Sequence, residues 1–261
     1  MNREYMTKLA LVWVGIFIVL VLMFWLLKFD LAFMAHWASF LFEGIGYTLL
    51  VSALSIFFAV ILALIGALAR LSNNPLANGI STFYVSFIRG TPLLVQVYLI
   101  YLGLPQVGQS LEALGAPGWL ADLFVLPAIP SGVLALSVNY GAYMTETFRA
   151  GIQSIHSGQR EAALALGMTS AQCMRRIILP QSLRLVIPPV GNDFIAMLKD
   201  SSLVSLMGVM ELSWRATKIG RRYFRSLETL AVAALFYWFM TIILQMFQAR
   251  IEERLGKGRK R

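Results

Sequence analysis

Long uncharged stretches separated by short charged segments make up most of this chain. Five of these stretches run from Leu9 to Leu27, Gly44 to Ala69, Gly90 to Leu111, Leu123 to Thr145 and Thr229 to Ala249. Each reaches the roughly 20 residues that a helix needs to cross about 30 Å of hydrocarbon. None alternates in polarity as a membrane β-strand would. The pattern therefore predicts helices that span a membrane.

A further segment, Leu185 to Met210, has an apolar pattern that is interrupted by Asn192, Asp193, Lys199 and Asp200. The excess of Lys and Arg on the cytoplasmic side does not decide whether this segment crosses, because both topologies satisfy the rule about equally. A charge at mid-bilayer costs at least about 2.5–3.5 kcal/mol unless it faces a bundle interior or an aqueous cavity. That cost favours a crossing segment beside a pathway, with a re-entrant or interfacial segment as the alternative.

Composition agrees with a membrane protein. Hydrophobic residues make up 58% and charged residues 13% of the chain, against about 45–50% and 25% in soluble domains. The net charge is +9, and many of the charges lie beside the spans, where basic residues orient a membrane protein. Nucleic acid is therefore not expected as a partner. The first stretch is too long for a signal peptide and is expected to remain as a helix. A single cysteine, Cys173, rules out an internal disulfide, and the separated His36 and His156 give no reason to expect a metal site.

Between the fourth stretch and the ambiguous segment lies a loop with helix punctuation. Ser157 is expected to cap a short helix over residues 158–166, and Gly167 is a natural left-handed stop. This first helix presents small apolar side chains, which suit either a groove on another protein or a purely structural hairpin.

The second half of the loop is expected to form another short helix. Thr169 and Gln172 have the spacing of a capping box at its start. Pro180 restricts Leu179 and is expected to end the helix. The product is two short helices joined at Gly167.

The string EAALALG, nine further residues and then IILP (Glu161 to Gly167, Ile177 to Pro180) resembles the EAA loop of ABC importer permeases. The resemblance implies that this loop docks into a cleft of a cytoplasmic ATP-binding subunit. ATP and Mg would bind that subunit, and this chain would bind no cofactor and have no catalytic residue. The coupling residues that the resemblance implies are Glu161, Ala162, Ala163, Gly167, Leu179 and Pro180.

Three other segments, FIRGTPLLVQ (Phe87 to Gln96), NYGAYMTETFRAGI (Asn139 to Ile152) and LKDSSLVSLMGVMEL (Leu198 to Leu212), are similar to polar amino acid uptake permeases. That family has a five-helix core beginning at the equivalent of Gly44. The resemblance therefore implies an all-α membrane protein with six transmembrane helices, one of them an extra N-terminal helix. It also implies that both termini are cytoplasmic and that residues 201–211 form a gate near the outer face.

The resemblance divides the chain into three regions. Residues 1–43 would hold the extra helix and an external linker, and residues 44–250 the transport domain with its coupling loop at 157–180. Residues 251–261 would form a basic cytoplasmic tail.

The implied function is a permease subunit of an ATP-driven amino acid importer in the bacterial inner membrane. Its partners would be the ATP-binding subunit, a second permease copy or paralogue, an extracytoplasmic solute-binding protein, the amino acid and membrane lipid. A sensory membrane subunit that uses the same fold without moving solute is the alternative. No span offers a nucleophile with a base, so an enzyme is not expected.

A zwitterionic amino acid in the membrane must exchange water for polar partners. On a helix, Asn192 and Lys199 share one stripe, and Asp193 and Asp200 share the neighbouring stripe. Acidic and basic groups on adjacent faces suit an ammonium and a carboxylate, although they would equally neutralise one another and brace the bundle. The predicted substrate-binding residues are Asn192, Asp193, Lys199, Asp200, Ser201 and Ser202.

Smaller features complete the predictions. Residues 188–191, with two prolines and a glycine, are expected to interrupt the helix before the charged cluster. Glu146 lies three residues before Arg149, which predicts an ion pair. Arg89, at the start of the third stretch, is expected to be a cytoplasmic anchor.

Overall fold

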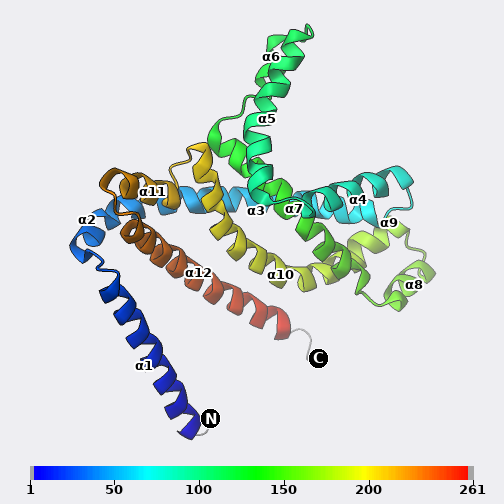
Figure 1. Cartoon of the computed structure of the whole chain (residues 1–261). Helices are drawn as coiled ribbons and strands as arrows, with labels where there is room; N and C mark the ends of the chain where they lie inside the picture. The colour runs from blue at the N-terminus through cyan, green and yellow to red at the C-terminus, as the bar shows by residue number, and fades with distance from the viewer. Residues whose placement is uncertain (1–2, 258–261) are drawn as a thin grey trace.

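The computed structural model describes residues 3–257, and this part of the chain is almost entirely helical, with no strand (Figure 1). The elements in chain order are α1 (Arg3–Leu26), α2 (Leu31–Phe42), α3 (Gly44–Arg70), α4 (Pro75–Arg89), α5 (Leu93–Ala113), α6 (Gly118–Asp122), α7 (Ala128–Gln153), α8 (Ser157–Ala165), α9 (Ser170–Cys173), the π-helical turn η1 (Met174–Ile178), α10 (Leu179–Asp200), the 3₁₀ segment η2 (Ser201–Met207), α11 (Leu212–Tyr223) and α12 (Ser226–Lys257).

Three helices of the described region, α1, α3 and α12, are long and apolar enough to cross a membrane. The bent pair α4 and α5 makes a fourth candidate if it is counted as one span. The protein is therefore an all-helical membrane protein, as predicted. Residues 258–261 of the predicted basic tail lie outside the described residues, and α12 continues through the rest of that tail.

Close packing of α3 on α7 forms the centre of the molecule. Ala59, Ala63 and Ala67 of α3 are fully buried in the cluster that this pair shares. A Cβ atom at Gly66 would lie 2.5 Å from the Thr145 hydroxyl oxygen, so only glycine fits at this position without a shift. Small residues let two helix backbones approach closely, which is the main source of association between helices in lipid.

The predicted third span, Gly90 to Leu111, corresponds to the continuous helix α5, which a sharp bend separates from α4. α4 ends at Arg89, and after a short turn the axis of α5 is bent by 110°. Proline at position 92 lacks a backbone N–H and disfavours the helical conformation in the residue before it, which explains why the helix stops here. In Figure 1, α5 and α6 project away from the remaining helices. Arg89 is the last residue of α4 and does not begin α5, and its expected role as a cytoplasmic anchor stays a prediction.

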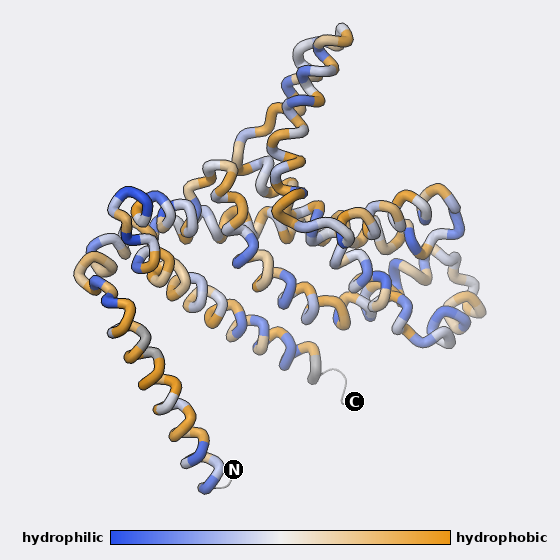
Figure 2. The backbone as a smooth tube through the Cα atoms, in the orientation of Figure 1, coloured by the Kyte–Doolittle hydropathy of each residue, from blue (hydrophilic) through white to orange (hydrophobic). Residues whose placement is uncertain are grey.

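α1 has no buried residue in its most apolar window and diverges from the bundle (Figure 1). Figure 2 shows that its apolar residues continue along nearly its whole length. The predicted external linker after α1 contains the helix α2. Asp30 caps that helix, accepting a hydrogen bond from the Phe33 N–H (2.9 Å) and one from Arg225 (2.6 Å). The Phe33 bond, and then the charge of Arg225, hold the pKa of the Asp30 carboxyl below its ordinary value.

The ambiguous segment of the sequence is a continuous helix, α10. Pro188 and Pro189 lie inside it without ending it, so the predicted interruption at 188–191 is wrong. Pro180 stands in the first turn of α10, where its missing N–H is not needed, and so begins this helix instead of ending the previous one. The wider turn η1 precedes it and displaces the carbonyl that a proline would otherwise meet.

Candidate functional site

The predicted coupling loop is folded as α8, a glycine turn and α9. His156, not Ser157, caps α8, because its ring Nδ1 accepts a hydrogen bond from the Gly158 N–H (3.1 Å). Gly167 has a φ of +78°, which confirms the left-handed stop. The capping box is confirmed in both directions: Gln172 N–H donates to Thr169 Oγ1 (3.2 Å), and Thr169 N–H donates to Gln172 Oε1 (2.9 Å).

The loop presents an exposed face of mixed chemistry. Glu161 and Ala162 are exposed, and the apolar side chains of Leu164 and Leu166 are 42% and 84% exposed. Ala163 is buried against the core cluster of α3, α7 and α10. Ala163 therefore supports α8 from behind, while its neighbours are free to contact another protein. Leu164 and Leu166 thus supply apolar surface that is open to contact with another protein.

The loop is joined to α10 without an interruption. Cys173 and Ile178 are buried in the same cluster as Ala163, which fixes α9 and η1 against the bundle. Leu179 is half-buried and Pro180 is exposed, both in the first turn of α10. The second predicted helix is thus the start of a helical stretch from Ser170 to Asp200, because helical hydrogen bonding continues through η1.

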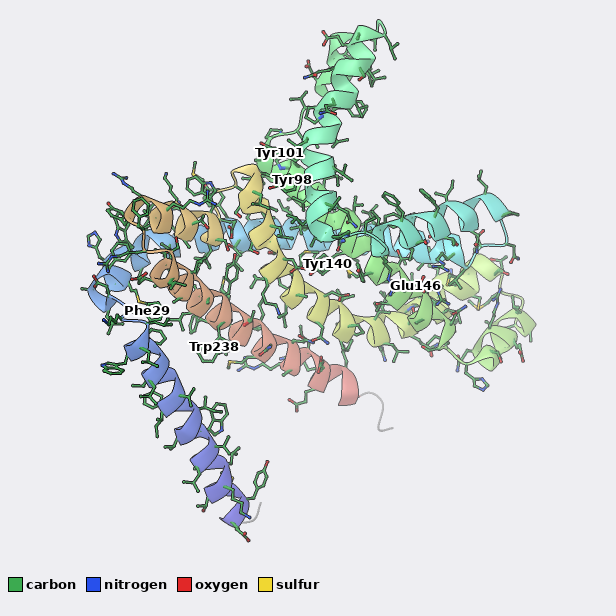
Figure 3. All side chains as sticks on the ribbon, viewed as in Figure 1. Phe29, Tyr98, Tyr101, Tyr140, Glu146 and Trp238 are labelled. Carbon is green, nitrogen blue, oxygen red and sulfur yellow. The ribbon has the colours of Figure 1, made fainter. Side chains whose placement is uncertain are left out.

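The predicted substrate residues of α10 fall on two faces that meet different neighbours. Asp200 Oδ2 accepts a hydrogen bond from the Tyr140 hydroxyl of α7 (2.7 Å). Figure 3 labels Tyr140 between α7 and α10. Asn192 Oδ1 accepts from Gln248 Nε2 of α12 (3.0 Å). Lys199 lies two turns beyond Asn192 on the same stripe and is exposed.

Mutual neutralisation of the charged residues is not what the structure shows. Among residues 3–257, no ion pair joins Lys199 to Asp193 or Asp200. Asp193 is half-buried on the Asp200 stripe. Asp193 and Asp200 therefore share one stripe of α10 and Lys199 lies on the neighbouring stripe, and Asp200 is held by its hydrogen bond from α7 and not by Lys199.

The two predicted serines begin η2, directly after Asp200. Ser201 is buried, and its hydroxyl donates to the Leu198 carbonyl within the chain (2.8 Å). Ser202 is half-buried, and its carbonyl accepts from the Ser205 hydroxyl (2.6 Å). Of the two, only Ser202 has side-chain surface open to a ligand.

Glu211 is a buried carboxylate that the sequence reasoning missed. It is fully buried beyond the end of η2 and accepts hydrogen bonds from the Trp214 N–H (2.7 Å) and the Tyr237 hydroxyl (2.7 Å). Thr48 of α3 adds a longer bond of 3.4 Å. These contacts join α11, α12 and α3. The sequence held a signal for this residue, because Glu211 is an acidic residue inside a largely apolar run, one position before Leu212.

The predicted ion pair between Glu146 and Arg149 is present, with an Arg149 Nη2 to Glu146 Oε2 distance of 2.8 Å. Arg70, at the end of α3, also pairs with Glu146. Figure 3 shows Glu146 farther along α7 than Tyr140, on the side of α8 and α9. One carboxylate thus links the ends of α3 and α7 close to the coupling loop.

A groove of about 550 Å³ lies between α3, α10 and α12. Its lining is almost wholly apolar, with Gln248 and Glu252 as exceptions. None of the six predicted substrate residues lines it. A charged amino acid finds no polar partner set there, so this groove is not the site that the charged residues define.

Comparisons with known proteins identify the family. Residues 59–257 match the family described as "Binding-protein-dependent transport system inner membrane component". The chain belongs to that family. The predicted ABC importer permease membership is thereby confirmed, and the coupling loop and charged helix α10 described above both lie inside the matched region.

Individual permeases resemble the chain over most of its length. The L-cystine transport system permease protein TcyB of Bacillus subtilis (strain 168) is 39% identical over 232 residues, 88% of this chain and 92% of that protein. The probable amino-acid permease protein YxeN of the same organism is 36% identical over 228 residues, 87% of this chain and 96% of that protein. The crystal structure of an amino acid ABC transporter with histidines is 35% identical, with a TM-score of 0.73, covering 87% of this chain and 99% of that one.

Proposed function

We propose that this permease is the membrane subunit of an ATP-driven importer of polar or charged amino acids. The observation that carries the proposal is the exposed coupling loop, in which Glu161 and two leucines face outward on a helix that is stopped by a left-handed Gly167. The amino acid permeases to which the chain is similar support the substrate class.

The coupling loop receives a cytoplasmic ATP-binding subunit, which holds ATP and Mg. The exposed faces of Ala162, Leu164 and Leu166 supply the apolar contact, and Glu161 supplies charge at its edge. The loop does no chemistry itself. Its task is to take up the movement of the ATPase and pass it to the helices behind Ala163.

Transmission of that movement runs along α10. The helical stretch from Ser170 leads without interruption to Asp200, and the 22 residues of α10 span about 33 Å at 1.5 Å per residue. A displacement at the loop therefore reaches the charged residues as a rigid movement of one helix. Asp193, Asp200 and Ser202 present polar groups there to a solute, and Asn192 and Lys199 occupy the neighbouring face.

The proposed topology has six spans with both termini in the cytoplasm of a bacterial inner membrane. α7 and α10 are counted as spans although they carry more polar residues than α1, α3 and α12. Their polar groups face other helices or the pathway, where a charge is tolerated. A second permease copy or paralogue completes the pathway, and an extracytoplasmic binding protein delivers the solute.

Uptake by the assembled complex tests the proposal. Vesicles containing the permease, its ATPase and its binding protein are offered labelled amino acids with and without internal ATP. Glu161→Lys is expected to abolish ATPase association and uptake, because it reverses the charge on the docking face. Gln159→Lys is the matched control, since it places a lysine about 200° around the same helix and is expected to leave uptake intact.

Two outcomes would overturn the proposal. Unchanged uptake in Glu161→Lys would show that the loop does not couple transport to the ATPase. ATPase activity that responds to solute without any vectorial uptake in the wild type would instead favour the sensory function.

The role of α10 has its own test. Asp200→Asn keeps the hydrogen bond from Tyr140 but removes the negative charge. It is expected to lower uptake of cationic amino acids most strongly, measured as a change in the preference among labelled solutes. A wild-type rate and preference would show that Asp200 serves only to hold α7 and α10 together.

A further inference from the structure

Arg89 is a cation at the break between α4 and α5 that has no counter-ion among the described residues. Its side chain is exposed, and its guanidinium carbon lies 5.2 Å from the centroid of the Tyr143 ring on α7. A cation over an aromatic face is attracted by the ring, but the contact leaves the five N–H donors of arginine free to bind an anion.

The depth of Arg89 follows from the packing of α4. Asn78 Nδ2 donates to the Arg70 carbonyl (2.7 Å) and Ser81 Oγ donates to the Gly66 carbonyl (2.8 Å), so α4 runs antiparallel to the end of α3. The 15 residues of α4 rise about 22 Å from that level. Arg89 therefore lies within the roughly 30 Å of hydrocarbon that α3 spans.

An unpaired arginine at this depth is costly unless it faces water or a solute. Two observations place it beside a polar face. Tyr143, which it covers, is 44% exposed. Tyr140 lies one turn earlier on the same side of α7 and donates its hydroxyl to Asp200 Oδ2 (2.7 Å). The face of α7 between α4 and α10 is thus bordered by a cation on one side and an anion on the other.

Lys199, the cation that the sequence suggested for this role, belongs to a different face. It shares its stripe with Asn192, which is bonded to Gln248 of α12. Asp200 shares its stripe with Asp193 and is bonded to α7. The basic group that lies against the α7 face carrying Tyr140 and Tyr143 comes from α4.

We propose that Arg89 binds the α-carboxylate of the transported amino acid while Asp200 receives its ammonium group. The inference rests on the proposed function, and it assigns the carboxylate end of the solute to the last residue of α4. A guanidinium suits this role because its planar fork matches the two oxygens of a carboxylate. Tyr140 and Tyr143 would line the solute between the two charges.

The test measures binding to the purified permease–ATPase complex without the binding protein, so that only the membrane site is probed. Labelled L-arginine, L-glutamine and L-cystine are screened first, and a solute that the wild type binds and transports is then displaced with its free acid and with its methyl ester. The wild type is expected to prefer the free acid at least tenfold. Arg89→Gln is expected to weaken binding of the free acid about 10–100-fold, as loss of a charged hydrogen-bond partner does, and to bring the acid-to-ester ratio close to one.

Two further variants make the result decisive. Arg89→Lys keeps the charge without the planar fork and is expected to give an intermediate acid-to-ester ratio. Arg222→Gln is the matched control, because Arg222 also lies over a tyrosine ring, 5.6 Å from the Tyr223 centroid, but on α11. It is expected to keep the wild-type ratio.

The outcomes separate this inference from the proposed function. Uptake by the wild type with an unchanged acid-to-ester ratio in Arg89→Gln would overturn the role of Arg89 and leave the importer proposal standing. If Arg89→Gln does not assemble, Arg89→Lys is the test variant. An affinity for the free acid and an acid-to-ester ratio equal to those of the wild type in Arg89→Lys would overturn the inference. A wild type that transports none of the solutes tested would refute the proposed function, and this inference with it.

Discussion

Gln96 and Asn139 form a buried hydrogen bond that holds the start of α5 against α7. Gln96 Oε1 accepts from Asn139 Nδ2 (2.8 Å), and Gln96 Nε2 reaches the Ile88 carbonyl (2.7 Å) and the Thr91 hydroxyl (2.7 Å) across the break. The two side chains are only 4% and 5% exposed. Gln96→Leu is therefore expected to loosen the 110° bend and destabilise the protein.

The magnitude follows from the groups that are left without a partner. Gln96→Leu removes the acceptor for Asn139 Nδ2, and a buried donor without a partner costs about 1–3 kcal/mol. Interhelical hydrogen bonds in membranes contribute less on average, about 0.6 kcal/mol, because the unfolded chain also finds partners. A loss of about 2 kcal/mol is expected for Gln96→Leu and about 1–2 kcal/mol for Asn139→Leu. The double variant removes both partners and is expected to lose little more than the larger single loss.

Unfolding of the purified protein in mixed micelles, titrated with sodium dodecyl sulfate and followed by circular dichroism, gives these differences in free energy. Gln106→Leu, an exposed change on the same helix, is the control and is expected to leave the midpoint unchanged. Fully additive losses in the double variant would refute the reasoning, because they would mean that the two amides do not depend on each other.

Three other predictions follow from contacts in the fold. Gly66→Ala is expected to lower the melting temperature by forcing its new Cβ against Thr145, and Thr145→Ala is expected to restore most of the loss. Glu211→Ala is expected to cost about 1–3 kcal/mol, as measured by chemical unfolding, because it removes the acceptor of the half-buried Tyr237 hydroxyl. The pKa of the Asp30 carboxyl is lowered in the folded protein. The stabilisation by its charge is therefore complete above the ordinary carboxyl pKa and is lost as the pH falls through the folded-state pKa. The melting temperatures of the wild type and Asp30→Asn are expected to converge in acid.

Each of these predictions has a result that would contradict it. If the melting temperature does not recover in the Gly66→Ala/Thr145→Ala double variant, the new Cβ atom at position 66 does not clash with Thr145. A Glu211→Gln variant as unstable as Glu211→Ala would mean that hydrogen bonding is not what Glu211 contributes. A constant difference between wild type and Asp30→Asn at every pH would show that the charge of Asp30 does not matter.

The parts predicted well from the sequence are those whose signal is local. Helix punctuation at Gly167, Thr169 and Gln172 depends on neighbouring residues only, and the structure reproduces it. The string EAALALG, followed after nine residues by IILP, likewise indicated the family. Pro180 misled the prediction because the same residue suits the first turn of a helix and the end of one, and only the wider turn η1 ahead of it decides between them.

Only part of the candidate substrate site could be predicted from the sequence. The two stripes of α10 follow from helical periodicity, but the sequence does not say which neighbour each stripe meets. Tyr140 gives Asp200 its partner and Gln248 gives Asn192 its own, across 60 and 56 residues of chain. The position of Arg89 at the end of α4 could not be predicted for the same reason, since the 110° bend depends on how α4 and α5 pack.

The sequence by itself determined that this chain has membrane-spanning helices, which family it belongs to and where its capped loop between α7 and α10 lies. Those properties depend on hydrophobic length and on short motifs, which any stretch of chain carries without reference to its neighbours. Only the tertiary structure decided which neighbouring helix each face of α10 meets, where α4 and α5 bend apart and that Glu211 joins α3, α11 and α12. Such facts depend on distances between residues remote in the chain, and periodicity within one helix holds no information about them.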